Sequence, residues 1–340
     1  MRANLKILFL FLFFVTYGCA LGHKMQIESE TIKVGFGSCV KDPNSPIWEA
    51  IAAKKLDTFL LLGDNIYQTS KDFQNEDAIR RLYQKLWDTP GFIKLREHTP
   101  LYAVWDDHDY GPNNCDSTYA GASTSLKVFD EYFPYKAAVE GSIAQEITIK
   151  GITILLVDDR SFRKNPQNSE FPQLLGTIQL EWLKEKLRHP TTPVILLASG
   201  NQWLTSALME KPKTYESLWQ FPIEQHQVLE AIDNSPAEVL LISGDRHFAE
   251  ILEMALTNRT ITEITSSPLS ASTVSIQETG LEPRRRLMAV GFTNFGVVTI
   301  NPADQCPLSR AEIYNNKGEA ILSYTPKCKK LHTPKMIQAR

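Results

Sequence analysis

The chain has 340 residues, of which 43% are hydrophobic and 22% charged, a composition typical of a globular protein that buries a full core. Its formal net charge of -3 argues against a general electrostatic attraction to nucleic acid or to an anionic membrane surface. Any anionic substrate must therefore be held by local cations or by metal ions.

The first twenty residues have the pattern of a secretory signal. Arg2 and Lys6 precede an uncharged apolar run, which small residues follow. The run is shorter than the roughly 20 residues of a membrane span, so an uncleaved anchor is the less favoured alternative. Cys19 offers another alternative, as the lipid-attachment cysteine of a lipoprotein. We expect residues 1–20 to be a signal peptide and residues 21–340 to form one domain of a secreted, periplasmic or cell-surface protein.

The rest of the chain alternates short apolar runs with helical patterns, which predicts an α/β fold whose central strands are covered on both faces. The predicted strands are residues 32–39, 58–64, 100–109, 152–161, 194–200 and 238–247, and the helices are residues 45–55, 75–87, 177–189 and 223–232. Thr177 is the expected N-cap of the third helix. Later segments, at residues 261–267 and 295–300, indicate β-strands, whereas residues 266–275 and 283–286 are typical of surface loops.

Near the C-terminus, AEIY and AILSYT flank NNKG and predict a β-hairpin. If Asn315 faces Glu319, the residue numbers of every opposed pair add up to 634, and Cys306 and Cys328 satisfy the same relation. We therefore expect these two cysteines to form a disulfide in an oxidising compartment, unless the prolines near them break the register.

Six of the predicted strands end in polar residues that are suited to binding metal ions or phosphate. Ligands bind beyond the carboxyl ends of the strands in open α/β sheets, so these residues are candidates for one site. A lone Asp after a strand is most often a turn former or a helix cap. Six strands that all end in polar residues are better explained by a shared site. The residues are Ser38 and Cys39; Asp64, Asn65 and Tyr67; Asp106, Asp107, His108 and Asp109; Asp158, Asp159 and Arg160; Asn201 and Gln202; Asp245, Arg246 and His247.

Two short motifs carry the metal-binding hypothesis. In GDNIY, Asp64 can bridge two metal ions, and Tyr67 can return to one of them three residues later. In GDRH, Asp245 and His247 are two residues apart, so both can face one side of an extended segment. Carboxylate, imidazole, thiolate, phenolate and amide oxygen suit a transition metal beside a second divalent ion, and Fe³⁺ would favour the ionised phenol.

The segments FGSC, LLGDNIY, WDDHDYGPN, LLVDDRSFR and ISGDRH, in this order over residues 36–247, resemble the alkaline phosphatase D (PhoD-like) family of the calcineurin-type metallophosphoesterases. The resemblance implies a four-layer α/β/β/α sandwich with mixed central sheets and a C-terminal β-hairpin. It also implies an alkaline phosphatase or phosphodiesterase that holds Fe³⁺ and Ca²⁺, with another divalent pair as the alternative, where a metal-activated hydroxide attacks phosphorus. The chain is short for this family, so we expect it to lack the additional N-terminal β domain of the larger members.

The resemblance also assigns the metal ligands. Expected ligands of the iron are Cys39, Tyr67 and His247, with Asp64 as the bridge and Asn113 and Asp245 on the second ion. Asn114 is the alternative to Asn113 if the register differs by one residue. Cys39 is alternatively a small buried hydrophobe or a disulfide partner of Cys115.

Further residues are expected to act on the substrate. The resemblance places His108 near the leaving group, where it would protonate the departing alkoxide. Either Asp106 or Asp107 would orient this imidazole or bind the second ion, and Asp107 is our catalytic candidate. Arg160 resembles the phosphate-binding arginine of the family. Asn201 is a further substrate-binding candidate, with a structural role as its alternative.

Two other functions compete with a phosphoesterase. A hydrolase with a nucleophilic side chain is disfavoured because the sequence contains no GxSxG, P-loop or HExxH motif. A secreted binding protein on the same fold is disfavoured because four motif residues are intact, namely Asp64, Tyr67, Asp245 and His247. We expect the partner to be a small phosphate ester, with no nucleic acid, and with membrane contact only through a lipid anchor or an uncleaved signal.

Overall fold

The structure is a computed structural model that describes residues 31–206 and 216–328. The predicted signal peptide, its boundary at residue 20 and Cys19 lie outside these residues. Within the described ranges, no helix has the length and apolar character that crossing a membrane requires.

Thirteen strands in the described part of the chain form two mixed sheets. They are β1 (Ile32–Gly37), β2 (Thr58–Leu62), β3 (Leu101–Val104), β4 (Gln145–Ile149), β5 (Ile152–Leu156), β6 (Val194–Ala198), β7 (Glu238–Ser243), β8 (Ala249–Ala255), β9 (Thr260–Thr265), β10 (Arg285–Ala289), β11 (Asn294–Ile300), β12 (Leu308–Asn315) and β13 (Ala320–Tyr324). The first sheet has the order β13-β12-β11-β1-β2-β3, and the second has the order β10-β8-β9-β7-β6-β5-β4. In each sheet a parallel part, β1 to β3 or β5 to β7 with β9, continues into antiparallel strands.

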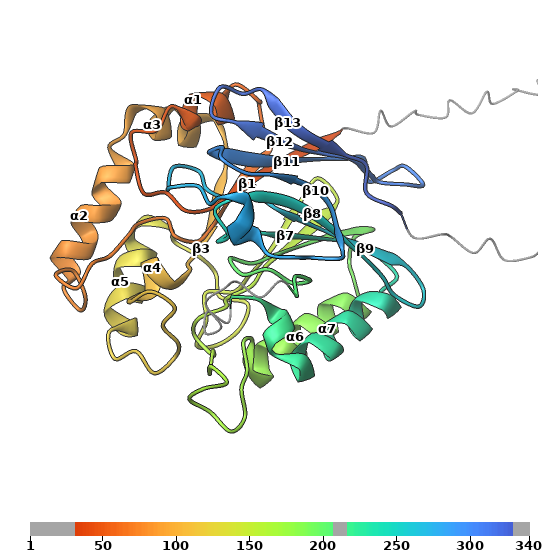
Figure 1. Cartoon of the computed structure of the whole chain (residues 1–340), viewed down its shortest axis with the longest axis horizontal. Helices are drawn as coiled ribbons and strands as arrows, with labels where there is room; N and C mark the ends of the chain where they lie inside the picture. Colours follow the sequence, from red (N-terminus) through yellow and green to blue (C-terminus); the bar gives the residue numbers. More distant parts are fainter. Residues whose placement is uncertain (1–30, 207–215, 329–340) are drawn as a thin grey trace, which may run out of the picture.

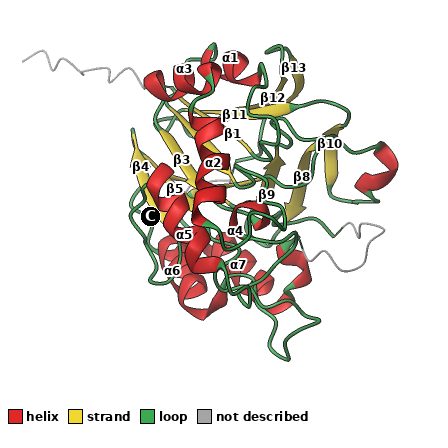
Figure 2. Cartoon of the chain, turned by 90° about the vertical axis from the view of Figure 1, so that its left-hand side faces the viewer, coloured by secondary structure: helices red, strands yellow, loops and turns green. Residues whose placement is uncertain are grey.

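Helices cover the outer faces of both sheets, which confirms the predicted four-layer fold (Figures 1 and 2). The helices are α1 (Ile47–Ala52), α2 (Glu76–Trp87), α3 (Pro90–His98), α4 (Asp107–Tyr110), α5 (Ala122–Tyr132), α6 (Gly176–Arg188) and α7 (Pro222–Asn234), with short 3-10 helices η1 (Leu218–Gln220) and η2 (Ile276–Thr279). Helices α1 and α3 lie beyond the first sheet, and α6 and α7 lie side by side beyond the second (Figure 1). The central strands β2, β5 and β6 are buried along their whole length, as expected for apolar runs between two layers.

The structure corrects two local predictions. Thr177 is not the N-cap of α6, because the helix begins at Gly176 and the Glu224 carboxylate accepts the free N–H groups at its start, including those of Leu175 at 3.0 Å and Gly176 at 2.9 Å. The predicted loop at residues 283–286 is wrong in its second half, because Arg285 and Arg286 belong to the edge strand β10, whereas Pro283 and Arg284 form a turn. Buried carboxylates of the neighbouring strand β8 pair with its arginines, which lets charged residues join the sheet.

The predicted disulfide between Cys306 and Cys328 is present, with the two Cα atoms 5.5 Å apart. The assumed register holds at the turn, where the Asn315 N–H donates to the Glu319 carbonyl. It shifts by one residue at a bulge further along β12 and β13. The cysteines lie beyond the paired strands, so their bond does not depend on a regular ladder.

Candidate metal centre

The ends of β1, β2 and β7 turn sharply, and the predicted metal ligands occupy these turns. Cys39, Asp64, Asp245 and His247 have φ angles of 66°, 52°, 62° and 57°, in the left-handed region that costs an L-residue about 1–2 kcal/mol. Gly63, with φ of 90°, makes the turn before Asp64 possible, because a Cβ there would lie 2.4 Å from the Cβ of Asp106. Backbone strain of this kind concentrates at functional sites.

The turns bring together side chains that are far apart in the sequence. The Cys39 Sγ lies 3.7 Å from Asp64 Oδ2 and 3.6 Å from the backbone oxygen of Asp245. Ser38, next to Cys39, fixes β1 to β7 because its hydroxyl accepts the Asp245 N–H at 2.9 Å. Cys39 is completely buried and, like Cys115, is a free thiol, so these two cysteines do not form the alternative disulfide.

Tyr67 and two histidines form the next part of the cluster. The Tyr67 hydroxyl lies 3.3 Å from His247 Nε2, although the two residues are 180 positions apart. The ring of Tyr67 also packs against that of His108, with centroids 4.3 Å apart. The phenol of GDNIY and the imidazole of GDRH therefore lie close enough to bind one ion.

Asp107, and not Asp106, reaches this cluster. Donor atoms of Asp64, Asp107 and His108 all lie within 4.8 Å of one another. Asp107 also accepts the Asn114 N–H at 2.5 Å, which holds the WDDHDYGPN loop over the site. Asp106 is turned away, because its side chain caps α4 and its Oδ1 accepts from Arg160 Nε at 2.6 Å. Of the two aspartates that the sequence left open, Asp107 lines the cavity, and its role there stays a prediction.

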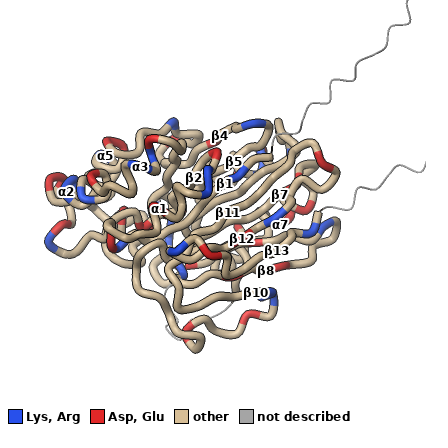
Figure 3. The backbone as a smooth tube through the Cα atoms, turned by 90° about the horizontal axis from the view of Figure 1, so that it is seen from above, with Lys and Arg blue, Asp and Glu red and all other residues tan. Residues whose placement is uncertain are grey.

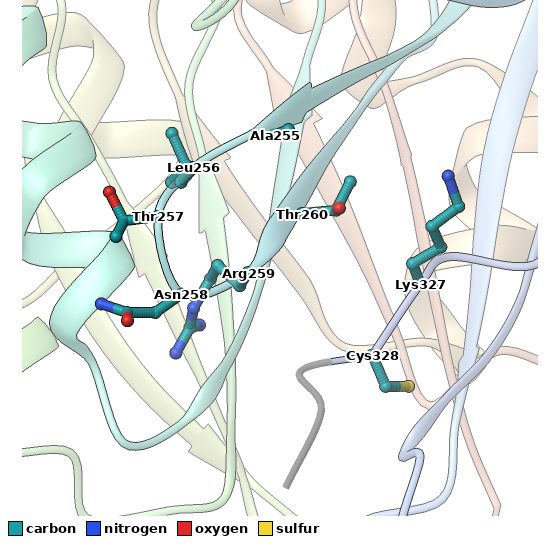
Figure 4. Close-up of a pocket in the computed structure, with 8 residues that line it drawn as sticks. All are labelled: Ala255, Leu256, Thr257, Asn258, Arg259, Thr260, Lys327 and Cys328. Atoms are coloured by element: carbon teal, nitrogen blue, oxygen red, sulfur yellow. The ribbon is translucent and has the colours of Figure 1, made fainter. Parts of the chain in front are cut away.

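A cavity of about 260 Å³ opens over the cluster. Its lining residues are Asp64, Asp107, His108, Asn113, Asn114, Glu216, Asp245, Arg246, His247 and Val274. Both asparagines of the predicted loop line it, so the choice between Asn113 and Asn114 as a ligand stays open. A larger cavity of about 540 Å³ lies at the turn between β8 and β9 and beside Lys327 and Cys328, and none of the predicted site residues lines it (Figure 4).

The two predicted substrate-binding residues do not line this cavity. Arg160 is fully buried, and its guanidinium is occupied by Asp106, by Glu216 at 2.6 Å and by the Cys115 carbonyl at 3.2 Å. Asn201 is also buried, and its Nδ2 donates to Glu216 at 2.8 Å. Since neither residue lines the cavity and both side chains are occupied by these contacts, the geometry opposes direct phosphate binding by Arg160 and supports the structural alternative for Asn201.

Glu216 is the residue that the sequence analysis missed. Its carboxylate lines the cavity and is held from behind by Arg160, Asn201 and Arg163, whose Nη2 lies 3.2 Å from Glu216 Oε1. Glu216 follows no apolar run and belongs to no motif quoted above, so only the folded chain reveals its position.

Burial, and after it the crowding of acidic groups, sets the electrostatics of the site. Burial and neighbouring carboxylates, Asp107 first among them, raise the pKa of Asp64 well above its usual value. Burial and the charges of Glu216 and Asp107 raise the pKa of Asp245 to about 8. Burial, followed by the charges of Asp64 and Asp245, also raises the pKa of the Cys39 thiol. Each of these groups would lose its proton more easily beside a bound cation.

The donor set fits such cations. Ligands about 2.0–2.3 Å from one ion lie about 3–4 Å from each other, as do the Cys39 and Asp64 donors and the Tyr67 and His247 donors. Thiolate, phenolate and imidazole suit a transition metal, whereas the carboxylates and asparagines that line the cavity suit a harder ion. The residues therefore fit two neighbouring ions, and their individual roles as ligands stay predictions.

Comparison with known proteins places this chain in a family. A structure of PhoD matches with a TM-score of 0.68 and 15% identity, covering 87% of this chain and 68% of that one. Purple acid phosphatase PPD1 from yellow lupin (Lupinus luteus) seeds matches with a TM-score of 0.60 and 10% identity. The match covers 87% of this chain and 53% of the phosphatase, so this chain spans about half the length of that protein. At such identities the likeness shows the fold alone, and the curated protein sequences give no match. The family model of the PhoD-like phosphatases matches residues 35–305, most of the chain, so the protein belongs to the PhoD-like phosphatase family.

Proposed function

We propose that the protein is an exported metal-dependent phosphoesterase that hydrolyses phosphate monoesters, phosphate diesters or both. One observation carries this proposal: three segments that are far apart in the sequence converge beside one cavity, and they bring together Cys39, Asp64, Tyr67, Asp245 and His247. Membership of the PhoD-like phosphatase family supports the same reaction class. The cavity of about 260 Å³ suits a small phosphate ester.

The proposed ions are Fe³⁺ and Ca²⁺. Cys39, Tyr67 and His247 would hold the iron, because thiolate, phenolate and imidazole favour a transition metal. Asp245 and one of the loop asparagines would hold calcium, and Asp64 would join the two ions through its two oxygens. When bound, such ions supply positive charge to the phosphate oxygens and a water of lowered pKa.

Side chains of the protein would then orient the ester and supply a proton to its leaving group. His108 lines the cavity with its ring packed against Tyr67, and it is our candidate for protonating the departing alkoxide, a contribution typically worth about 10² to 10⁴-fold in rate. Asp107 keeps this histidine in place, because its Oδ1 accepts the backbone N–H of His108 at 3.0 Å. The same carboxylate fixes the loop that carries the asparagines.

Export is part of the proposal. A disulfide such as Cys306–Cys328 persists in oxidising compartments, which supports a secreted, periplasmic or cell-surface location. Basic and acidic residues are interspersed along the backbone in Figure 3, in keeping with the low net charge. We therefore expect the protein to bind small phosphate esters and not nucleic acid.

An activity panel tests the proposal. Purified protein would be assayed on phosphomonoesters, phosphodiesters and phospholipids, before and after metal removal by a chelator and after metal is added back. We expect hydrolysis that is lost with the metals and returns with them, and that falls at least 100-fold in Asp64→Asn but not in the exposed control Asp130→Asn. Protein that holds its metals and hydrolyses none of these esters would instead support the binding-protein alternative.

A further inference from the structure

Arg246 is the one arginine or lysine among the described residues that line the cavity. It stands between Asp245 and His247 in the turn after β7, where its N–H donates to the Gly244 carbonyl at 2.7 Å. The side chain is only 5% exposed. The turn therefore places a nearly buried cation between two candidate metal ligands.

Two of the three nitrogens of this guanidinium have no partner among the described residues. Nη1 donates to Gln202 Oε1 at 2.9 Å, and the guanidinium carbon lies 5.7 Å from the centre of the Phe248 ring. Nε and Nη2 are buried and have no hydrogen-bond partner in the part of the chain that the structure describes. Buried donors of this kind are rare because they lose the hydrogen bonds that water would provide.

The two unpartnered nitrogens belong to the same edge of the guanidinium. The Nε–H and the outer Nη2–H point in parallel, which is the arrangement that holds two oxygens of one phosphate in a bidentate manner. The contact with Gln202 occupies the other side of the group and leaves this edge available. A lysine at the same place would keep the charge but would lose the paired geometry.

Other arginines near the site do not offer such an edge. Arg160 uses its Nε and both Nη groups on Asp106, Glu216 and Cys115. Arg163 is fully buried and binds Glu216 and Asn201. Neither Arg160 nor Arg163 therefore has a free pair of N–H groups with which to bind phosphate as the sequence suggested for Arg160.

We propose that Arg246 is the substrate-binding arginine, which donates Nε–H and Nη2–H to two oxygens of the phosphoryl group. This inference rests on the proposed function, since it names the group that would hold the ester beside the metal ions. It assigns to GDRH a second role: Asp245 and His247 as ligands, and Arg246 as the anion-binding side chain between them.

Calorimetric titration of the metal-loaded protein with inorganic phosphate tests the inference. We expect Arg246→Lys to weaken phosphate binding about 10- to 100-fold, because one bidentate charged contact is lost. Metal content should stay unchanged, and the matched control Arg310→Lys, at an exposed position on β12, should bind phosphate like the wild type. Equal phosphate affinity in Arg246→Lys and wild type would overturn the inference.

Two further results keep this inference distinct from the proposed function. A wild-type protein that hydrolyses no ester would refute the proposed function, whereas the phosphate titration would still decide on Arg246. If Arg246→Lys does not fold, a crystal structure of the wild-type protein with phosphate decides instead. Two phosphate oxygens within hydrogen-bond distance of Nε and Nη2 would support the inference, and phosphate bound away from this edge would overturn it.

Discussion

The buried ion pairs behind the cavity give a sharp prediction for Glu216→Gln. Glu216 receives hydrogen bonds from Arg160 at 2.6 Å, Asn201 at 2.8 Å and Arg163 at 3.2 Å, and both arginine side chains are 0% exposed. Removing one partner of a buried pair typically costs about 3–5 kcal/mol, because the remaining charge stays in the interior. Glutamine keeps one acceptor, and Asp106 still pairs with Arg160, so we expect a loss of about 3 kcal/mol.

Urea-induced unfolding of the metal-loaded protein, followed by tryptophan fluorescence, measures this loss. The matched control is Glu146→Gln, which removes the partner of Lys186 at 2.7 Å in a pair whose side chains are 27% and 32% exposed. Pairs near the surface contribute about 0–1 kcal/mol, so the control should unfold almost like the wild type. Equal losses in the two variants would refute the view that Glu216 neutralises the buried arginines.

Three other predictions concern separate parts of the molecule. Burial raises the pKa of Glu253, but Lys327 and other partners outweigh this effect and hold the pKa below the usual 4.5. Glu253→Gln should therefore lower the free energy of unfolding by about 1 kcal/mol at pH 7. Urea titrations should show that this difference disappears as the pH falls below 4.5. Replacing both Cys306 and Cys328 by serine should cost about 3 kcal/mol, as expected for a closed loop of this length, and an unchanged urea midpoint would contradict it. Iron-loaded protein should be coloured by charge transfer from the Tyr67 phenolate, and a Tyr67→Phe variant that binds iron and keeps this absorption band would exclude Tyr67 as its source.

The sequence predicted the layers of the fold because strands buried on both faces are continuous apolar runs. The runs TFLLL and VILLA, for example, are β2 and β6. Charged or mixed segments were harder to predict. Arg285 in β10 looks like part of a loop until the buried carboxylate of Glu250 is placed opposite it, at 2.7 Å. Similarly, Thr177 has the properties of an N-cap, but Glu224 from another helix takes over that function.

The candidate site shows the same division between local and distant information. GDNIY and GDRH are local patterns, and they predicted that Asp64, Tyr67 and His247 lie at one site, where the structure brings them close together. Whether an arginine after a strand faces a cavity or the interior depends on its distant neighbours. The sequence therefore indicated Arg160 as the phosphate-binding arginine, although Arg160 is paired in the interior. It assigned no role of its own to Arg246, which lines the cavity.

The most direct test of the whole account is a crystal structure of the protein as purified, with anomalous diffraction recorded at the iron and calcium-sensitive wavelengths. We predict an iron peak bonded to Cys39 Sγ, the Tyr67 phenolate oxygen and His247 Nε2, with a second ion on the other oxygen of Asp64 and on Asp245. Ions bound elsewhere, with these five side chains unligated in an active enzyme, would contradict the account.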